Sequence, residues 1–471
     1  MTRPGLAARL AAYRCLEAVE AQGAFANLAM PAILRESGLA GREASFATEL
    51  AYGTIRLQGL YDAIIGAASG RDPARLEAPV RRVLRLGAHQ ALSMRVPAHA
   101  AVSETVALMR EIGRPGVAGL ANAVARRMSE AELDEWRDRV APGDSDAALA
   151  IRHSHPAWIV GRLRQALEAD GRAGELGSLL AAHNEPASVT LVARPGLISR
   201  SELLVSVRGG EPTSLSPIGV VMSGGDPGGI AAVRDARAGV QDEGSQVVAL
   251  AACEAPTLAG ASALSGGPPE AWHDMCAGPG GKAAILACVA ASRGASLDAT
   301  ELHAHRTELV EQALRALPAG SVALRTADAR MVDRSYDRVL LDAPCTGLGA
   351  LRRRPEARWR RTEADLTDLV HLQGELLAAG LRSLRPGGVL AYVTCSPVVA
   401  ETGGAVARAL AAPEGAGFEV LDARAAVATV TGTAPEAWGS GPFVQMWTHV
   451  HGTDSMFLAL LRSPGTPHGA Q

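Results

Sequence analysis

The sequence predicts a multi-domain chain with an all-α helical bundle, a small α+β linker subdomain and an α/β domain built on a doubly wound parallel sheet. Three observations predict this organisation. The chain has 471 residues, enough for two to four domains. Apolar residues recur every three or four positions over residues 1 to about 130, as in short amphipathic helices. From residue 271 onwards, short β-type runs alternate with helical runs, as in α/β domains.

Composition limits the function classes. Hydrophobic residues make up 48% of the chain, which is ample for cores, and no apolar run is long enough to span a membrane. Arg14 and Glu17 interrupt the apolar pattern at the N-terminus, which favours an amphipathic helix over a signal peptide. The net charge is −3, so any nucleic-acid binding must come from local patches. We expect a cytoplasmic monomer.

The six cysteines form no Cys-x-x-Cys pair, so neither a metal site nor a disulfide framework is indicated. Cys15, Cys253 and Cys288 lie in alanine-rich helical patterns and are expected to be small buried hydrophobes.

Breaks in these patterns predict the domain boundaries. A charged helix ends at Ala-Pro-Gly-Asp, residues 141 to 144, where a linker is expected. Short strands are expected at 188–193 and 219–222, and a helix capped by Asp242 follows. The expected parts are the bundle at 1–135, the helical linker with the α+β piece at 136–235, the α/β domain at 236–464 and a disordered tail at 465–471.

Six arginines concentrate positive charge in one region of the bundle. They allow two interpretations, an RNA-facing surface or an ordinary solvated face, and the sequence alone favours the solvated face. The residues are Arg71, Arg75, Arg81, Arg82, Arg85 and Arg95.

A glycine-rich turn at residues 274–282 lies between a short strand and a helix expected at 283–291. Such a turn lets the backbone approach a ligand, and the helix N-terminus offers unpaired N–H groups. A phosphate-binding P-loop is excluded, because it needs Gly where Cys276 stands and Ser or Thr where Ala283 stands. Lys282, the only lysine in the chain, indicates a need for a compact ammonium. A nucleoside-type ligand is expected here.

Polar residues follow several strands of the predicted sheet. Glu301, Asp328, Asp342 and Cys395 each come at or just after a strand end, and in parallel sheets these ends meet at one ligand-binding edge. A carboxylate at Glu301 suits a ribose diol, and one at Asp328 suits an adenine edge. Together with the glycine turn they describe an S-adenosylmethionine pocket as well as any other nucleoside site. Helix caps and surface carboxylates remain the alternative for each residue alone.

Two cysteines narrow the chemistry. Cys345 in Asp-Ala-Pro-Cys and Cys395 in Thr-Cys-Ser-Pro each follow a predicted strand. Carbon 5 of cytosine is a poor nucleophile, and adding a thiolate to carbon 6 makes it able to attack an electrophilic methyl group. The reaction also needs a partner for the N3 edge of the base and help with release. A cationic neighbourhood would raise the thiolate fraction.

An arginine-rich run directly after Cys345 offers both positive charge and an aromatic ring, which suits phosphates and a stacked or flipped base. The expected RNA-binding residues are Arg352, Arg353, Arg354, Arg358, Trp359 and Arg360. A solvated helix entry is the alternative.

Two resemblances fit these motifs. Residues 49–56, 84–92 and 101–106 resemble the NusB-type RNA-binding helical domain. The segments 276–282, 342–349, 393–397 and 452–457 resemble the Sun/RsmB-type RNA cytosine-5 methyltransferases, which have a Rossmann-like class I domain dependent on S-adenosylmethionine. The family usually has Ala and Asp at two positions where this chain has Gly278 and Glu301. Both replacements are expected to preserve the chemistry of the site.

The resemblance implies a role for each residue. Cys395 is the nucleophile, Cys345 assists product release, Asp342 holds the cytosine near its N3 edge and Lys282 orients groups around it. The implied substrate is small-subunit ribosomal RNA, and no metal is implied. The implied binding residues for S-adenosylmethionine are Cys276, Ala277, Gly278, Pro279, Gly280, Gly281, Lys282, Glu301, Arg306, Asp328 and Asp342.

Three alternatives stay open at this point. In a DNA cytosine methyltransferase the Pro-Cys thiol, here Cys345, would attack the base. The enzyme could act on another RNA, such as tRNA. A non-catalytic RNA-binding assembly factor would bind S-adenosylmethionine without transferring its methyl group.

Overall fold

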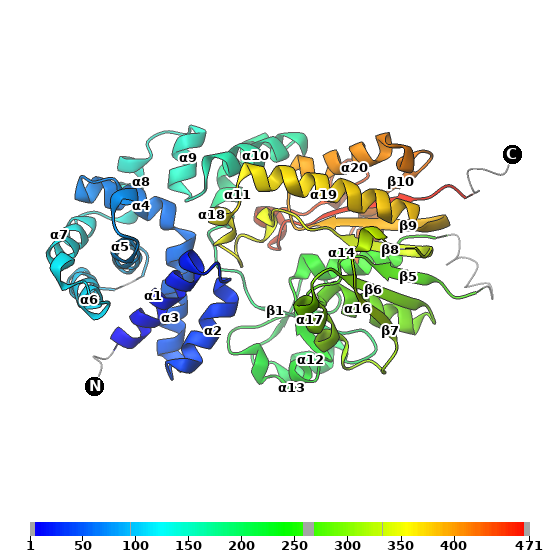
Figure 1. Ribbon diagram of the computed structural model, residues 1–471, viewed down its shortest axis with the longest axis horizontal. Helices are drawn as coiled ribbons and strands as arrows, with labels where there is room; N and C mark the ends of the chain where they lie inside the picture. The colour runs from blue at the N-terminus through cyan, green and yellow to red at the C-terminus, as the bar shows by residue number, and fades with distance from the viewer. Residues whose placement is uncertain (1–4, 95, 258–267, 332, 466–471) are drawn as a thin grey trace. The chain divides into compact units, whose positions relative to one another are not determined.

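The computed structural model describes residues 5–94, 96–257, 268–331 and 333–465, which form two compact units (Figure 1). Unit 1 comprises residues 1–164, 174–186 and 351–361, and unit 2 comprises 165–173, 187–350 and 362–471. The division expected from the sequence, at residues 135, 235 and 464, stays a prediction. Arg95 and the tail beyond residue 465 lie outside the described residues.

Unit 1 is helical, as the apolar periodicity predicts. In α5, buried Val80, Val83, Leu84 and Leu86 repeat at helical spacing and face a core that includes Tyr61. The first nine helices are α1 (Leu6–Ala21), α2 (Ala26–Glu36), α3 (Gly41–Arg56), α4 (Gln58–Ser69), α5 (Ala78–Leu92), α6 (Ala98–Glu111), α7 (Ala118–Met128), α8 (Leu133–Val140) and α9 (Asp146–Arg152). They are followed by α10 (Ala157–Ala169), which runs on into unit 2, and α11 (Leu176–Ala182).

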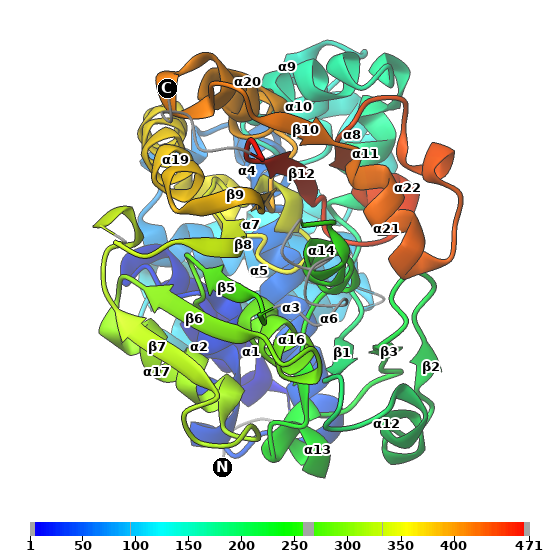
Figure 2. The same ribbon diagram turned by 90° about the vertical axis from the view of Figure 1, so that its right-hand side faces the viewer.

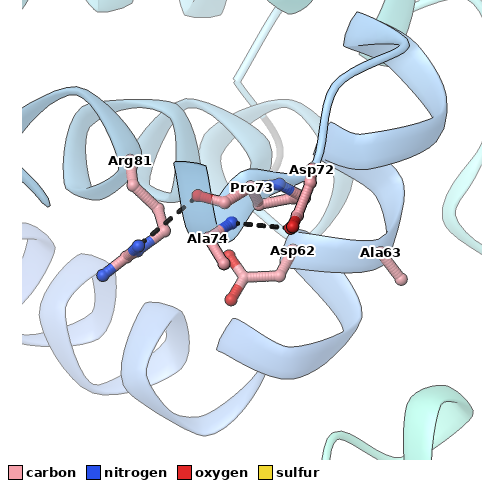
Figure 3. Close-up of a pocket in the computed structure, with 6 residues that line it drawn as sticks. All are labelled: Asp62, Ala63, Asp72, Pro73, Ala74 and Arg81. Atoms are coloured by element: carbon pink, nitrogen blue, oxygen red, sulfur yellow. Dashed lines mark hydrogen bonds between the residues drawn. The ribbon is translucent and has the colours of Figure 1, made fainter. Parts of the chain in front are cut away.

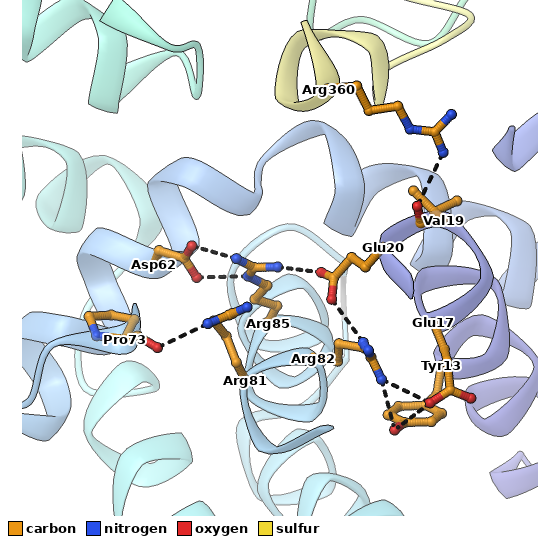
Figure 4. Close-up of polar contacts among 10 residues, drawn as sticks. All are labelled: Tyr13, Glu17, Val19, Glu20, Asp62, Pro73, Arg81, Arg82, Arg85 and Arg360. Atoms are coloured by element: carbon orange, nitrogen blue, oxygen red, sulfur yellow. Dashed lines mark hydrogen bonds and ion pairs between the residues drawn. The ribbon is translucent and has the colours of Figure 1, made fainter. Parts of the chain in front are cut away.

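Two arginines of the basic region are internal, which corrects the expected solvated face (Figure 4). Arg85 donates to both carboxylate oxygens of Asp62, at 2.7 and 2.6 Å, and to Glu20 at 2.6 Å. Arg82 donates to Glu20 at 2.8 Å and to Glu17 at 2.9 Å. Both arginines are only 5% exposed, so their charge is neutralised inside the bundle.

The segment 351–361 belongs to unit 1, although the residues before and after it belong to unit 2. Its short helix α18 (Ala357–Arg360) carries Arg358, which is completely buried. The Arg358 guanidinium donates to Asn184 Oδ1 at 2.8 Å and to the main-chain oxygens of Ser154 and His183, each at 3.1 Å. Burial lowers the pKa of Arg358 to about 9, which still leaves it charged at neutral pH.

These contacts correct the RNA-binding prediction for Arg358, because its donors face protein carbonyls inside unit 1. Trp359 donates its indole N–H to the oxygen of Ile55 at 3.0 Å, and a Cβ on Gly59 would lie 2.5 Å from the Trp359 ring. Arg360 reaches the main-chain oxygen of Val19 at 3.2 Å (Figure 4). Arg352 and Arg353 are half-buried, and Arg354 is exposed. The RNA-binding role of the residues other than Arg358 stays a prediction.

Unit 2 contains a small four-stranded antiparallel sheet, in the order β2-β3-β1-β4, close to where short strands were expected. The strands are β1 (Thr190–Ala193), β2 (Glu211–Pro212), β3 (Gly219–Val221) and β4 (Ala238–Val240). Helices α12 (Arg200–Ser206) and α13 (Ala231–Arg234) accompany this sheet. Its buried face includes Leu191, Val220 and Ala238.

The larger sheet of unit 2 runs in the order β10-β12-β9-β8-β5-β6-β7, with β11 paired to β12. The pairs from β9 to β7 are parallel, as expected, whereas β12 pairs antiparallel with both β9 and β10. The sheet is therefore mixed, and its antiparallel end was not predicted. The strands are β5 (Ala271–Asp274), β6 (Ser296–Glu301), β7 (Val322–Thr326), β8 (Tyr336–Asp342), β9 (Leu384–Thr394), β10 (Glu419–Leu421), β11 (Val444–Gln445) and β12 (Phe457–Arg462).

Helices cover both faces of this sheet. Figure 1 shows α19 and α20 on one face and α14, α16 and α17 on the other, and Figure 2 shows β5, β6 and β7 side by side. Asp242 caps α14 by accepting from the N–H of Gly244 at 2.9 Å, as predicted. The helices are α14 (Glu243–Glu254), α16 (Gly281–Ser292), α17 (Ala304–Leu314), α19 (Glu363–Arg382), α20 (Gly403–Ala411), α21 (Ala423–Thr431) and α22 (Thr448–His451). Within the described ranges no helix is both long and apolar enough to cross a membrane.

Replacement of Arg358 by methionine should lower the free energy of unfolding of unit 1 by about 3 kcal/mol, because several buried acceptors lose their donor. Hydrogen exchange of peptides from residues 5–164 measures the stability of unit 1 within the intact chain. A single unfolding midpoint would not do so, because the two units can unfold separately. Arg126→Met, on the exposed side of α7, is the matched control and should change stability by less than about 0.5 kcal/mol. Equal exchange in both variants would contradict a structural role for Arg358.

Candidate active site

The glycine turn lies where the sequence placed it, between β5 and α16. Gly280, at φ +108°, adopts a conformation that other residues rarely take, and a Cβ there would lie 2.6 Å from Cβ of Ala313. A Cβ on Gly278 would lie 2.3 Å from a carboxylate oxygen of Glu301. The absent side chains therefore let the turn lie against the end of β6 at Gly278 and against residues 310 and 313 of α17 at Gly280.

Glu301 and Arg306 lie at this turn. The N–H of Gly278 donates to Glu301 at 3.1 Å, and the N–H of His303 donates to its other oxygen at 3.0 Å. Arg306 donates to the oxygen of Gly278 at 2.5 Å and forms an ion pair with Glu301 at 3.5 Å. The side chain of Glu301 is 3% exposed, so it forms the floor of the turn rather than part of an open surface.

Asp328 follows β7, at the same edge of the sheet. Both of its oxygens pair with Arg330, at 3.0 and 2.6 Å, and the hydrogen bond to Arg330 lowers the pKa of Asp328. Arg330 also contacts Glu375 of α19. Asp328 is thus ionised and held in place, and an adenine contact from it would have to share this carboxylate with Arg330.

Lys282 and Asp342 join the glycine turn to the end of β8. The Lys282 ammonium donates to Asp342 Oδ2 at 2.8 Å. Burial of the ammonium acts against its charge, yet the charge and hydrogen bond of Asp342 raise the pKa of Lys282 above its ordinary value. Lys282 therefore stays a cation in a largely buried position.

Asp274, at the end of β5, was not predicted as a site residue. It is 1% exposed, and neither of its side-chain oxygens has a hydrogen-bond partner among the described residues. Burial, and then the charge of Asp342, raise the pKa of Asp274 to about 7. At neutral pH this carboxyl is partly protonated.

The two cysteines of the Pro-Cys and Thr-Cys motifs lie together. Cys345 and Cys395 are free thiols whose sulfurs are 3.4 Å apart. The hydrogen bond from Cys345 lowers the pKa of Cys395, and the charge of Lys282 adds to this effect. The same hydrogen bond, together with burial, raises the pKa of Cys345 well above its ordinary value. The two thiols are therefore chemically unequal, and Cys395 is the readier thiolate.

The C-terminal motif at residues 452–457 reaches this site. The N–H of Ser455 donates to the oxygen of Gly349 at 2.9 Å, and the N–H of Gly349 donates to the oxygen of Cys395 at 2.9 Å. A Cβ on Gly349 would lie 2.1 Å from the oxygen of Ser455. Gly349 is thus required for the close approach of the two cysteine loops and the C-terminal motif at residues 452–457.

Two further polar residues of this site were missed by the sequence analysis. Glu401, in a short 3-10 helix (Val399–Glu401), and Gln373, in α19, are completely buried beside the cysteine loops. The one local signal for Glu401 was an acidic residue close behind the Thr-Cys motif, and Gln373 lies in an ordinary helical pattern.

Other features of the structure carry no comparable chemistry. Unit 1 has an open hollow of about 300 Å³ lined by Asp62, Ala63, Asp72, Pro73, Ala74 and Arg81, none of which is a predicted site residue (Figure 3). In the part of the chain that the structure describes, no group of three or more His, Cys, Asp or Glu side chains could hold a metal ion.

Comparisons with known proteins agree with this geometry. Residues 261–462 match the model of the 16S rRNA methyltransferase RsmB/F family, and residues 6–130 match that of the NusB family. The putative methyltransferase Rv1407 of Mycobacterium tuberculosis is 46% identical over 98% of this chain and 97% of its own length. The ribosomal RNA small subunit methyltransferase B of Pseudomonas putida is 31% identical over 87% and 90%.

The fold is also that of a solved structure. The crystal structure of PH0851 shares it with a TM-score of 0.76 at 21% identity, covering 98% of this chain and 99% of that one. Helical unit, mixed sheet, glycine turn and sequence relatives all lead to one assignment: the chain belongs to the RsmB/F family of S-adenosylmethionine-dependent RNA methyltransferases and carries a NusB domain at its N-terminal end.

Proposed function

We propose that this protein transfers the methyl group of S-adenosylmethionine to carbon 5 of a cytosine in small-subunit ribosomal RNA, acting as a cytoplasmic monomer. The observation that supports this most is the pair of thiols, 3.4 Å apart, at the edge of the sheet that also holds the Lys282–Asp342 ion pair. A pyrimidine ring needs one thiolate to activate carbon 5 and a second group to help release the product. The name of the Pseudomonas putida relative supports the choice of RNA.

The glycine turn and its neighbours fit the cofactor. Glu301 accepts a hydrogen bond from the N–H of Gly278 in this turn, and we assign its carboxylate to a ribose diol. The remaining contacts proposed are those of residues 276–282, Arg306, Asp328 and Asp342. When bound, S-adenosylmethionine supplies an electrophilic methyl group.

The proposed chemistry begins at Cys395. Its thiolate adds to carbon 6 of cytosine, forming an S–C bond and moving the electron pair of the 5,6 double bond to carbon 5, which takes up the methyl group and leaves S-adenosylhomocysteine. The carbon 5 proton then passes to water or a basic group, its electron pair re-forms the double bond, and the S–C bond breaks with Cys395 leaving as the thiolate. Cys345, whose sulfur is nearest, assists this release. Asp342, oriented by Lys282, holds the base near its N3 edge.

Single substitutions separate the roles of the two thiols. Cys395→Ser should form no covalent complex with RNA, because the nucleophile is lost. Cys345→Ser should accumulate a complex that survives denaturing electrophoresis, because release is impaired. Cys288→Ala, in α16, is the control and should behave as the unaltered protein. If complex formation needs Cys345 and proceeds without Cys395, the assignment of the nucleophile is wrong.

Lys282→Met should change the pH dependence of methyl transfer. The charge of Lys282 lowers the pKa of Cys395, so its removal raises that pKa, reduces the thiolate fraction at pH 7 and moves the acid limb of the kcat profile to higher pH. We expect a loss of about 10²-fold at pH 7 with partial recovery at higher pH. Equilibrium binding of S-adenosylmethionine, measured in parallel, shows whether the variant still holds its cofactor. An unshifted acid limb would rule out this electrostatic role.

Bisulfite sequencing tests the substrate. Cells that produce the protein should protect one additional cytosine of small-subunit ribosomal RNA from conversion, and cells that produce Cys395→Ser should not. Protection that appears in tRNA alone would redirect the proposal to another RNA. Binding of S-adenosylmethionine with no protection in any RNA would favour a non-catalytic assembly factor.

A further inference from the structure

One buried carboxylate connects the two cysteine loops. Glu401 is 0% exposed, and both of its oxygens accept hydrogen bonds. Oε1 accepts from the N–H of Thr346 at 2.7 Å and from the amide of Gln373 at 3.1 Å. Oε2 accepts from the hydroxyl of Ser396 at 2.6 Å and from the hydroxyl of Thr346 at 2.5 Å.

Two of these donors adjoin the two cysteines in the sequence. Thr346 directly follows Cys345, and Ser396 directly follows Cys395. One carboxylate thus holds the residue after each of the two thiols. Gln373 adds a further tie, because its amide also donates to the oxygen of Pro344 at 2.9 Å, just before Cys345.

Glu401 is itself fixed. Its main-chain oxygen accepts from the hydroxyl of Tyr392, in β9, at 2.7 Å, and its N–H donates to the oxygen of Val398 at 2.8 Å. The main chain of Glu401 is therefore anchored to β9, the strand that precedes Cys395, and its carboxylate reaches across to the loop that follows β8.

A buried carboxylate is a costly way to fill space. The four donors named above are neutral groups, and without them a buried carboxylate would lose its hydration with nothing to replace it. An apolar side chain would fill the same volume without that cost, but it could not bind two loops at once. A hydrogen-bonded carboxylate at this position is explained if the site requires a fixed separation of the two cysteine loops.

We propose that Glu401 is a positioning residue whose buried carboxylate fixes the loop after Cys345 to the loop after Cys395 and thereby sets the distance between the two sulfurs. The inference deepens the function proposed above, because these sulfurs are the ones given catalytic roles there. Glu401 acts through Thr346 and Ser396 and does not touch the reacting ring.

The thiol pair provides a readout that needs neither RNA nor cofactor. Charged and titratable groups act on Cys395 from each neighbouring element: Cys345 and Asp342 from the end of β8, Lys282 from α16 and Asp454 from the C-terminal motif. Of these, the hydrogen bond from Cys345 depends on the loop separation. Loosening the loops should therefore raise the pH at which iodoacetamide alkylates half of the Cys395 thiol. Peptide mass spectrometry measures the extent of this alkylation. The charge of Glu401 also raises the pKa of Cys345, so Thr346→Val, which leaves every charge in place, isolates the effect of loop separation.

Glu401→Leu should raise this midpoint by about one pH unit and lower kcat by about 10²-fold, with KM for S-adenosylmethionine within about twofold of the unaltered protein. Glu401→Gln keeps the shape and part of the hydrogen bonding, so it should show the same changes to a smaller degree. Glu311→Leu and Glu311→Gln, on an exposed position of α17, are matched controls and should change neither quantity.

Thr346→Val keeps the experiment decisive if Glu401→Leu does not fold, since it removes one hydroxyl donor and leaves the carboxylate. An alkylation midpoint equal to that of the unaltered protein, in variants with native circular dichroism, would overturn the positioning role. A raised midpoint with unchanged methyl transfer supports the positioning role and counts against the proposed catalytic roles of the thiols. Lost methyl transfer with an unchanged midpoint overturns the positioning role and leaves the proposed function intact.

Discussion

The parallel pairing of β8 with β9 is the constraint on which the site depends. Asp342 lies opposite Val393 in this pair, so both strands end at the same level of the sheet. Cys345 follows the first strand and Cys395 follows the second, and their loops then have only one strand spacing, roughly 5 Å, to bridge. A shift of the register by one residue would turn each side chain to the opposite face and separate the thiols.

The charged groups of the site lie around the ends of these paired strands. Lys282 arrives from α16, at the next strand of the sheet, and its ion pair with Asp342 brings a cation to the same edge. The hydrogen bond from Cys345 and this charge both lower the pKa of Cys395, whereas burial and the charge of Asp342 raise it. Burial, and then the charge of Asp342, raise the pKa of Asp274 at the same edge of the sheet. The site thus combines a buried ion pair with two thiols in contact.

Much of this could be predicted from the sequence because the informative patterns are local. The strands that end near Asp274, Glu301 and Asp342, the glycine turn and the two cysteine motifs are each encoded within about ten residues. The partners of Arg82, Arg85 and Arg358 could not be predicted, because their acceptors lie far away in sequence and a buried arginine looks like a solvated one in a helical pattern. Glu401 was missed for the same reason. The antiparallel pairing of β12 was missed because strand direction in a sheet depends on tertiary structure and not on a local sequence pattern.

The central claim is that both sulfurs act on one pyrimidine ring and that Cys395 attacks it. Ribosomal RNA carrying 5-fluorocytosine tests this most directly, because fluorine at carbon 5 cannot leave as a proton and the adduct stays bonded to the enzyme. After digestion with nuclease and protease, mass spectrometry identifies the cysteine that carries the base. The account predicts the nucleotide on the peptide that contains Cys395, dependent on S-adenosylmethionine for its methyl group. A nucleotide on Cys345, or no adduct with an RNA that the enzyme methylates when unmodified, would contradict it.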